Sequence, residues 1–412
     1  MVCFVGLMCH APIVIPAVAG REAHTCVHTT RAMREVAHRV VRSRPDRLVL
    51  VSPHSPRVDG FAAWRGRHVG DLGDFRTPGV AVNLPDAPEV WQGLELPAVP
   101  GPPGWLDHGA MVPLAFLWEA GWRGPTAILA LPRRPGPGNE ALGRRLAELP
   151  GRTAVIASGD MSHRLIPGAP AGFHRRARDF DAAFVAGLEA EDWEAAKRAE
   201  PRELAAEDVV ETTRVAMGAA GQPLHAEVLA YEGPWGVGYT EAVLFDPDPP
   251  LYAVARRAIR ERTLGRRPTR YAEGPVSAGV FVTLRKDERL RGCIGHVAPV
   301  CANLWEEVAE CARAAARTDP RFPPVKRGEL DALEIEVSVL EPPEPISGPG
   351  ELDPAVYGVV VTAGNRRGLL LPEVAGIDTV DDQLRIARQK GDISAWEDQV
   401  LERFTVRKEV QP

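Results

Sequence analysis

Three histidines follow apolar segments of the sequence at similar short intervals. His10 ends the run CFVGLMCH, His54 the run LVLVSPH, and His163 the run AVIASGDMSH. In an open α/β sheet the carboxyl ends of parallel strands meet at one edge, and ligands bind in the crevice there. Histidine is the commonest metal ligand and also titrates near neutral pH. For any one of these residues an ordinary strand-to-loop turn is the alternative. The three together predict a shared crevice that binds a metal ion or transfers protons.

A metal site needs a further ligand, and the sequence offers several carboxylates. Two histidines, one carboxylate and open positions make up the arrangement of non-haem Fe(II) sites. The segment RELAAEDVVETTRVAMGAAG places Glu203, Glu207 and Glu211 four residues apart, on one face of a predicted helix. That spacing is also typical of a solvated stripe. Glu241, in a predicted strand, is another possible ligand. His108, just before a predicted helix, belongs either to the site or only to a helix cap.

The elements that must position these residues alternate between strands and helices. Apolar strands are expected at 3–8, 47–52, 126–131 and 153–158, with helices at 25–44 and 113–120. A long helical region is expected from 173 to about 220, followed by strands at 225–231 and 238–245. Short apolar strands that alternate with helices predict an α/β domain with a mainly parallel central sheet.

The pattern changes after the segment DPDPP, residues 246–250, whose composition predicts a linker. We therefore expect one domain at 1–245 and a second at 251–412. The second domain begins with a helix at 251–264, and a hairpin-like pair, GVFVTL and RLRGCIG, follows. Further on, we expect a helix at 303–317, a strand in LEIEVSVL, a hairpin turning at Gly364-Asn365, and a mostly helical tail from 381 to 404. This order predicts a smaller α+β domain.

Composition and charge exclude several classes of protein. The chain has 412 residues, 45% of them hydrophobic, and a net charge of −6. No block rich in Lys and Arg points to nucleic-acid binding or to a basic membrane-binding patch. No apolar run approaches the ~20 residues of a membrane span. The 6 cysteines form no CxxC pair, so neither a disulfide framework nor a zinc ribbon is expected. The reducing cytoplasm is the expected location.

The motifs of the first domain occur in an order that resembles a known family. MCHAP, SPHSP, LDHGAMVPL, SGDMSHRL and YEGPWGVGY resemble the LigB-type class III extradiol dioxygenases and the related Memo proteins, from residue 1 to about 245. The resemblance implies a metal held by His10, His54 and Glu211, the last on a helix that precedes Gly221. Memo-like relatives have Cys at the third position. The resemblance further implies His163 as the acid/base residue and His108 as a second histidine near the substrate.

The reaction implied by this resemblance is cleavage of a catechol ring beside its two hydroxyl groups. Fe(II) is the implied metal, another divalent ion the alternative, and O₂ the second substrate. A hydroxyl bound to such a metal loses its proton more readily, and a nearby histidine can take that proton. Two other functions stay open. The domain could bind a metal without cleaving rings, as a Memo-like component of a radical SAM-associated modification system, or it could be a non-catalytic interaction scaffold.

The second half resembles a different family. The strings LRGCIG, DPRFPPV, LEIEVSVLEPPEPI and GLLLPEVA resemble the AMMECR domain over roughly residues 250–412. The pairing is similar to the long, fused form of the AmmeMemoRadiSam system protein A group, which implies a Memo-like protein or a radical SAM enzyme as partner. Cys293 in LRGCIG is either an accessible nucleophile or a buried apolar residue. DPRFPPV predicts a rigid exposed loop and hence a recognition edge.

Overall fold

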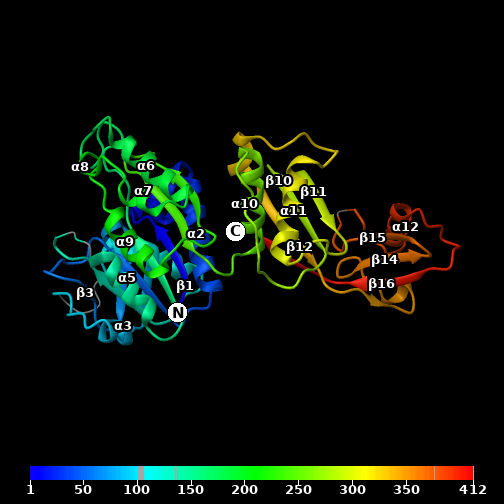
Figure 1. The fold of residues 1–412 in the computed structure, drawn as a ribbon, viewed down its shortest axis with the longest axis horizontal. Coiled ribbons are helices and arrows are strands. Elements are labelled where there is room, and N and C mark those ends of the chain that lie inside the picture. Colours follow the sequence, from blue (N-terminus) through cyan, green and yellow to red (C-terminus); the bar gives the residue numbers. More distant parts are fainter. Residues whose placement is uncertain (101–105, 135, 137, 375, 412) are drawn as a thin grey trace. The chain divides into compact units, whose positions relative to one another are not determined.

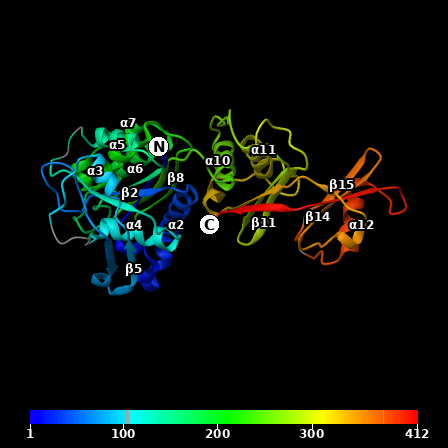
Figure 2. The ribbon, with the colours of Figure 1, turned by 90° about the horizontal axis from the view of Figure 1, so that it is seen from below.

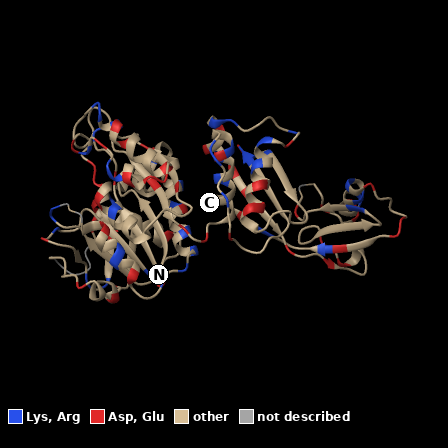
Figure 3. Ribbon diagram, viewed as in Figure 1, with Lys and Arg blue, Asp and Glu red and all other residues tan. Residues whose placement is uncertain are grey.

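The computed structural model describes residues 1–100, 106–134, 136, 138–374 and 376–411. It divides into two compact units, Met1–Pro249 and Pro250–Gln411 (Figure 1). The boundary lies within the Pro-rich segment 246–250. Acidic and basic residues are interspersed along the helices of both units (Figure 3). Among the described residues, no helix combines the length and the apolar composition that crossing a membrane requires.

Unit 1 is built on a mixed sheet with the strand order β3-β6-β2-β7-β1-β9-β8 among its described residues. Its strands are β1 (Val2–Met8), β2 (Arg47–Ser52), β3 (Ala62–Ala63), β6 (Thr126–Ala130), β7 (Thr153–Ser158), β8 (Glu227–Glu232) and β9 (Tyr239–Phe245). The central strands β6, β2, β7 and β1 are parallel, whereas β3, β9 and β8 are antiparallel to their neighbours. The predicted α/β fold with a mainly parallel sheet is confirmed. A separate ribbon pairs β4 (His68–Leu72) with β5 (Thr77–Leu84).

Helices cover both faces of this sheet, because its central strands are apolar on both sides. Leu48 and Leu50 of β2 pack into the core on the side of α2 and α4, and Val49 and Val51 into the core on the side of α5 and α9. The helices are α1 (Pro16–Ala19), α2 (Val27–Arg42), α3 (Pro88–Gly93), α4 (His108–Glu119), α5 (Gly138–Glu148), α6 (Ala177–Glu189), α7 (Trp193–Lys197), α8 (Arg202–Ala205) and α9 (Val209–Ala220), with short 3₁₀ turns η1 (Pro12–Val14), η2 (Gly20–Cys26) and η3 (Gly73–Phe75). Each central strand is therefore buried on two faces, as parallel sheets require.

The long helical region expected at 173–220 is four helices instead. The chain is interrupted where polar residues or proline start a new helix: Asp192 caps α7 with its side chain, and Pro201 precedes α8. Asp208 stands at the N-cap of α9. The chain changes direction at each break. Spacing along one continuous helix therefore does not predict where a side chain near a break points.

Unit 2 contains two antiparallel sheets, β11-β10-β12-β17 and β13-β16-β14-β15 within the described residues. The strands are β10 (Val280–Lys286), β11 (Arg289–His296), β12 (Glu334–Leu340), β13 (Glu344–Pro345), β14 (Gly358–Ala363), β15 (Arg366–Leu370), β16 (Val400–Phe404) and β17 (Val406–Val410). The helices are α10 (Leu251–Leu264), α11 (Leu304–Arg317) and α12 (Val380–Gly391), with 3₁₀ turns η4 (Arg327–Ala332) and η5 (Pro349–Glu351). Helices α10 and α11 share one core with the first sheet, and α12 packs on the second (Figure 2). The predicted α+β class is confirmed.

The tail corrects one prediction. Helix was expected from 381 to 404, but α12 ends at Gly391 and Asp392 adopts a left-handed conformation. Beyond it, β16 pairs with β14 and β17 pairs with β12. These strands are held by partners far away in the sequence, so helical propensity is overridden by strand pairing.

Helices α5 and α9 of unit 1 touch backbone to backbone. A Cβ on Gly143 would lie 2.1 Å from the carbonyl oxygen of Val215, and a Cβ on Gly218 would lie 2.3 Å from that of Glu140. Neither side has a side chain that could move aside. The two glycines therefore set how closely α9 approaches the rest of the unit.

We predict that Gly218→Ala destabilises unit 1 by roughly 1–3 kcal/mol, the usual cost of overpacking a rigid contact. Calorimetry on the full-length chain measures the change in its unfolding transition. Gly60→Ala is the matched control, because a Cβ at Gly60 meets no atom within 4 Å. Equal stability of the two variants would contradict the role of this helix crossing.

Candidate metal centre

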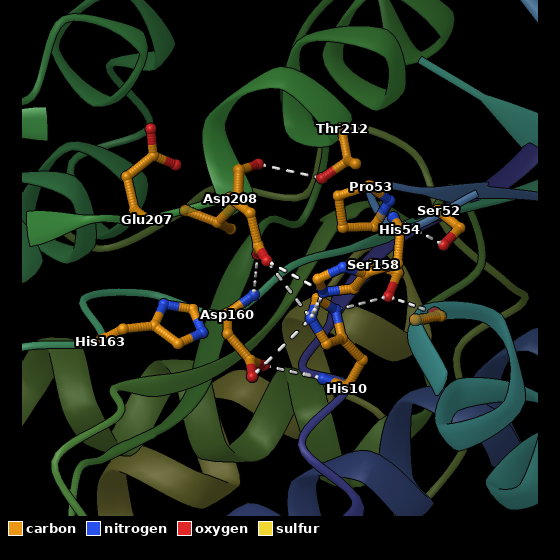
Figure 4. A network of polar contacts seen from close by, with 12 residues as sticks. His10, Ser52, Pro53, His54, Ser158, Asp160, His163, Glu207, Asp208 and Thr212 are labelled. Atoms are coloured by element: carbon orange, nitrogen blue, oxygen red, sulfur yellow. Dashed lines mark hydrogen bonds and ion pairs between the residues drawn. The ribbon is translucent and has the colours of Figure 1, made fainter. Parts of the chain in front are cut away.

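The parallel strands bring His10 and His54 to one edge of the sheet. His10 follows the end of β1 by two residues, and His54 follows the end of β2 by two residues. Strand β7 lies between β1 and β2 and is parallel to both. The Nε2 atoms of the two imidazoles are 3.0 Å apart. His10 and His54 therefore lie close together, as the sequence predicts (Figure 4).

The carboxylate beside them is Asp208. Its Oδ2 lies 3.4 Å from Nε2 of His10 and 3.3 Å from Nε2 of His54. Donor atoms held at about 2.1 Å from one ion lie roughly 3.0–3.4 Å apart at octahedral or tetrahedral angles. The three atoms therefore fit the first shell of a single divalent metal ion, with two nitrogen donors and one oxygen donor.

Glu211, the ligand implied by the family resemblance, is not brought into this group. Its carboxylate accepts a hydrogen bond from Nδ2 of Asn139 at 2.7 Å and pairs with Arg202 at 3.1 Å. Among the described residues, no hydrogen bond or ion pair joins Glu211 to either histidine. The reason is positional: α9 begins at Val209, so Asp208 lies at its start and faces the sheet edge, whereas Glu211 is already in the first turn. An Asp directly before the apolar run VV is the sequence signal that could have identified the carboxylate beside the two histidines.

The other carboxylates considered in the sequence have different roles. Glu207 pairs with Arg202 at 2.6 Å and also accepts a hydrogen bond from the Val210 N–H. Glu203 lies in α8. Glu241 is fully buried in β9, and burial raises its pKa well above the ordinary value. Burial thus disfavours its anionic form, and among the described residues no hydrogen bond or ion pair joins it to His10 or His54.

The tautomer of His10 follows from its second nitrogen. Nδ1 of His10 is 3.0 Å from Oγ of Ser158, and that hydroxyl donates to the carbonyl oxygen of Gly109 at 2.5 Å. A carbonyl can only accept, so the Ser158 hydroxyl must accept from Nδ1–H of His10. In the neutral imidazole, the form that binds a metal, the lone pair of His10 is thereby left on Nε2, the atom that faces Asp208. Such an orienting hydrogen bond is typical of metal-binding histidines.

The charges around the two histidines and Asp208 favour a cation at this position. Burial acts to lower the pKa of His10, but the nearby carboxylates of Asp160 and Asp208 outweigh it and raise that pKa to about 9. Burial acts to raise the pKa of Asp208, but the positive charge of His10 and hydrogen bonds from His10 and His54 hold it well below the usual range. The loops are also tied together, because the Asp160 N–H donates to Oδ1 of Asp208 at 2.7 Å.

Asp107, the N-cap of α4 and the neighbour of His108 in sequence, is hydrogen-bonded to the loop that carries His54. The carboxylate of Asp107 accepts hydrogen bonds from the hydroxyls of Ser52 at 2.6 Å and Ser55 at 2.7 Å, and from the backbone of α4. The ring of His108 lies 4.2 Å from that of His54, centroid to centroid. Burial, followed by repulsion from His54 and His10, lowers the pKa of His108 to about 4. His108 is therefore a neutral imidazole at neutral pH.

His163 lies on the other side of the centre. Its ring stands beside Asp160 and Asp208 in Figure 4. Nδ1 of His163 is 2.8 Å from the carbonyl oxygen of Ala206, so this nitrogen carries the proton and donates it. The lone pair is on Nε2. All four histidines predicted from the sequence thus surround one place, two of them in the triangle with Asp208.

Asp181 anchors the loop that carries His163. It accepts a hydrogen bond from the Ser162 N–H at 2.9 Å and one from the Tyr231 hydroxyl at 2.7 Å. Burial raises the pKa of Asp181 to about 6, although these two hydrogen bonds act in the opposite direction. The folded state therefore holds this proton more tightly than the unfolded chain, where the pKa is about 3.9.

Besides the group of His10, His54 and His108, whose possible ligand atoms lie within 4.8 Å of one another, a second group lies in unit 2, formed by His296, Glu307 and Cys311. Nδ1 of His296 is 2.5 Å from Oε1 of Glu307, which is a hydrogen-bond distance and too short for two ligands of one ion. The other oxygen of Glu307 accepts the N–H groups of Val300 and Cys301. We interpret this group as a clamp on the turn before α11.

Two family models match the chain. The catalytic LigB subunit of aromatic ring-opening dioxygenase matches residues 5–241, and AMMECR1 matches residues 252–409. This is the predicted order of the two resemblances, which is thereby confirmed.

Among relatives, Clostridium acetobutylicum protein CA_C1420 is 30% identical over 97% of this chain and 97% of its own length. A Thermotoga maritima protein is 54% identical over 32% of this chain and 76% of its own length. A crystal structure of the uncharacterized protein PH0010 from Pyrococcus horikoshii is 36% identical, covers 38% of this chain and 88% of its own, and has a TM-score of 0.35.

The geometry predicts opposite outcomes for the two carboxylates. Asp208→Ala removes a ligand and should weaken binding of Zn(II), or of Fe(II) under anaerobic conditions, at least roughly 100-fold. Glu211→Gln keeps the length of the side chain and one of the two acceptor oxygens that face Asn139 and Arg202, and should change the affinity less than about threefold. Competition titration with a chromophoric chelator measures both. Loss of binding in Glu211→Gln with binding retained in Asp208→Ala would reverse the assignment.

Asp181 predicts a pH dependence of stability. Its folded pKa is raised, so its contribution is full below about pH 4 and is lost as the pH rises through about 6, by up to roughly 3 kcal/mol. Asp181→Asn removes this titration. Urea denaturation at several pH values from 4 to 7 measures it, because all other groups titrate alike in both proteins. The stability of Asp181→Asn relative to wild type should rise with pH, and a constant difference would count against the assignment.

Proposed function

The chain belongs to the family of the catalytic LigB subunit of aromatic ring-opening dioxygenases, and from that premise we propose that unit 1 is an Fe(II)-dependent oxygenase of the extradiol ring-cleavage type. The observation that carries the proposal is the triangle formed by Nε2 of His10, Nε2 of His54 and Oδ2 of Asp208. Two histidines and a carboxylate with open positions are the ligand set of non-haem Fe(II) oxygenases. A bound Fe(II) would supply positions for a catecholate and for O₂.

The two remaining histidines suit different tasks. Nε2 of His163 carries a lone pair, because Nδ1 donates its proton to the carbonyl of Ala206. We assign His163 as the base that takes a proton from a hydroxyl of the substrate. His108 is neutral at physiological pH because its pKa is about 4, so it accepts or donates hydrogen bonds without adding charge. We assign it to positioning the substrate.

A second candidate function keeps the metal and omits ring cleavage. Its support is the fusion itself, because the Clostridium relative matches this chain along 97% of both lengths, across the LigB and the AMMECR1 regions. Two units that stay together along a whole relative favour a shared task. In this function unit 1 would be a Memo-like component of a modification system with a radical SAM partner. The absence of turnover in metal-loaded protein would favour it.

We predict that the Fe(II)-loaded chain consumes O₂ in the presence of a catechol from a varied panel, and that His163→Ala lowers kcat by about 10²–10⁴-fold, the usual contribution of a general base. The metal content of His163→Ala should stay that of the wild type. An oxygen electrode and metal analysis give the two readouts. His24→Ala is the matched control, since that histidine is exposed and, among the described residues, hydrogen-bonds only to the nearby carbonyl of Arg21. Full metal loading with no O₂ consumption on any catechol would refute ring cleavage.

A further inference from the structure

The first turn of α4 contains a residue without a side chain that is linked to His10. Gly109 is the second residue of α4, and it is buried. Its carbonyl oxygen accepts the hydroxyl of Ser158 at 2.5 Å, and Oγ of Ser158 lies 3.0 Å from Nδ1 of His10. Gly109 is therefore the far end of the hydrogen-bond chain that leaves the lone pair of the neutral His10 imidazole on Nε2, the atom beside Asp208.

The same residue lies against the second histidine of the triangle. A Cβ on Gly109 would lie 3.1 Å from Cδ2 of His54. It would also lie 2.6 Å from Oγ of Ser52 and 2.9 Å from Oδ1 of Asp107, two atoms that are themselves hydrogen-bonded at 2.6 Å. Ser52 is the last residue of β2, at the start of the loop that carries His54. A side chain at position 109 would therefore displace the imidazole or break the hydrogen bond that anchors its loop.

Neither helix formation nor backbone conformation explains a glycine at this position. The φ of Gly109 is not positive, so its backbone conformation does not require glycine. Glycine is also among the weakest helix formers. At Gly143 and Gly218 an added Cβ would meet backbone atoms of a neighbouring helix, which is a purely structural contact. At Gly109 the nearest atoms belong instead to His54 and to the two residues that hold its loop.

We propose that Gly109 is a positioning residue for both histidine ligands of the candidate metal centre. Its carbonyl oxygen orients His10 through Ser158, and its missing side chain leaves the space beside the imidazole of His54. The inference rests on the metal centre that carries the proposed function, but not on the reaction performed there. Hydrogen bonds outside the ligand set contribute about 10–100-fold to metal affinity, so both contacts can be measured by metal binding alone.

Substitution of Gly109 in the full-length chain tests the contact with His54. Gly109→Ala should weaken the binding of Zn(II) at least about tenfold, because the added Cβ displaces a ligand or the residues that support it. It should also shift the visible absorption bands of the Co(II)-loaded protein, since these bands report the arrangement of the ligands around the ion. Competition with a chromophoric chelator and absorption spectroscopy give the two readouts.

Gly93→Ala is the matched control for this substitution. A Cβ on Gly93 would lie 2.7 Å from Cδ2 of Leu149, a side chain that packs against the core on the side of α5 and α9. Both variants therefore introduce a steric conflict into unit 1, and both should lower Tm. Only Gly109→Ala should change the Zn(II) affinity and the Co(II) spectrum, because only there does the conflict involve a ligand of the metal centre.

The link to His10 is tested separately by Ser158→Ala, which removes the hydroxyl between Nδ1 of His10 and the carbonyl of Gly109. The Zn(II) affinity should fall about 10–100-fold. Thr240→Val is its control, because it removes another buried hydroxyl of the same sheet, one that donates to the carbonyl of Ala230. The affinity of this control should equal that of the wild type.

The outcomes separate the role of Gly109 from the metal centre itself. Wild-type affinity and spectrum in Gly109→Ala, or equal losses in Gly93→Ala, would overturn the proposal. Wild-type affinity in Ser158→Ala would overturn it as well, and this variant decides the question if Gly109→Ala does not fold. A wild-type chain that binds neither Zn(II) nor Co(II) would refute the metal centre, and with it both the proposed function and the role of Gly109.

Discussion

Nε2 of His10, Nε2 of His54 and Oδ2 of Asp208 lie within 3.4 Å of one another, and three such electron-rich atoms require a positive charge between them. The rest of unit 1 holds these atoms in place. The lone pairs of two imidazoles and a carboxylate oxygen repel one another unless a proton or a metal ion lies among them. In the metal-free protein the proton of His10 supplies that charge, which is why its pKa is raised. A divalent ion competes for the same place, so metal binding at this centre is coupled to proton release.

Bringing the three atoms together takes constraints from the whole unit. The parallel order β2-β7-β1 places two histidine loops at one edge, and Ser158 at the end of β7 turns His10 toward the centre. The carboxylate comes from α9, whose distance from the sheet is set by glycine contacts with α5. A metal site at the carboxyl edge of a parallel sheet thus depends on helix packing on the far side of α9 as much as on the loops themselves.

The sequence alone was enough to predict the site residues that directly follow the ends of strands. His10 and His54 were predictable because apolar strands are recognisable and parallel strands end together. The carboxylate that lies beside them was not, since the chain turns between α8 and α9. A shift of three residues separates Asp208 from Glu211, and helical spacing assigns both to one helix while only the cap residue faces the sheet edge. In the tail, β16 and β17 were missed for a related reason: their pairing partners lie far away in the sequence, and local propensity contains no information about them.

The cysteines of this chain differ in reactivity because their surroundings differ. Cys9 is the direct neighbour of His10, but its thiol is fully buried in an apolar cluster, and burial raises its pKa well above the ordinary value. It therefore stays a neutral thiol and leaves the metal centre with nitrogen and oxygen donors only. Cys293 is partly exposed on the edge strand β11. Because the thiolate is the reactive species and needs solvent access, burial makes Cys9 inert beside the candidate metal centre, whereas Cys293 in unit 2 stays accessible.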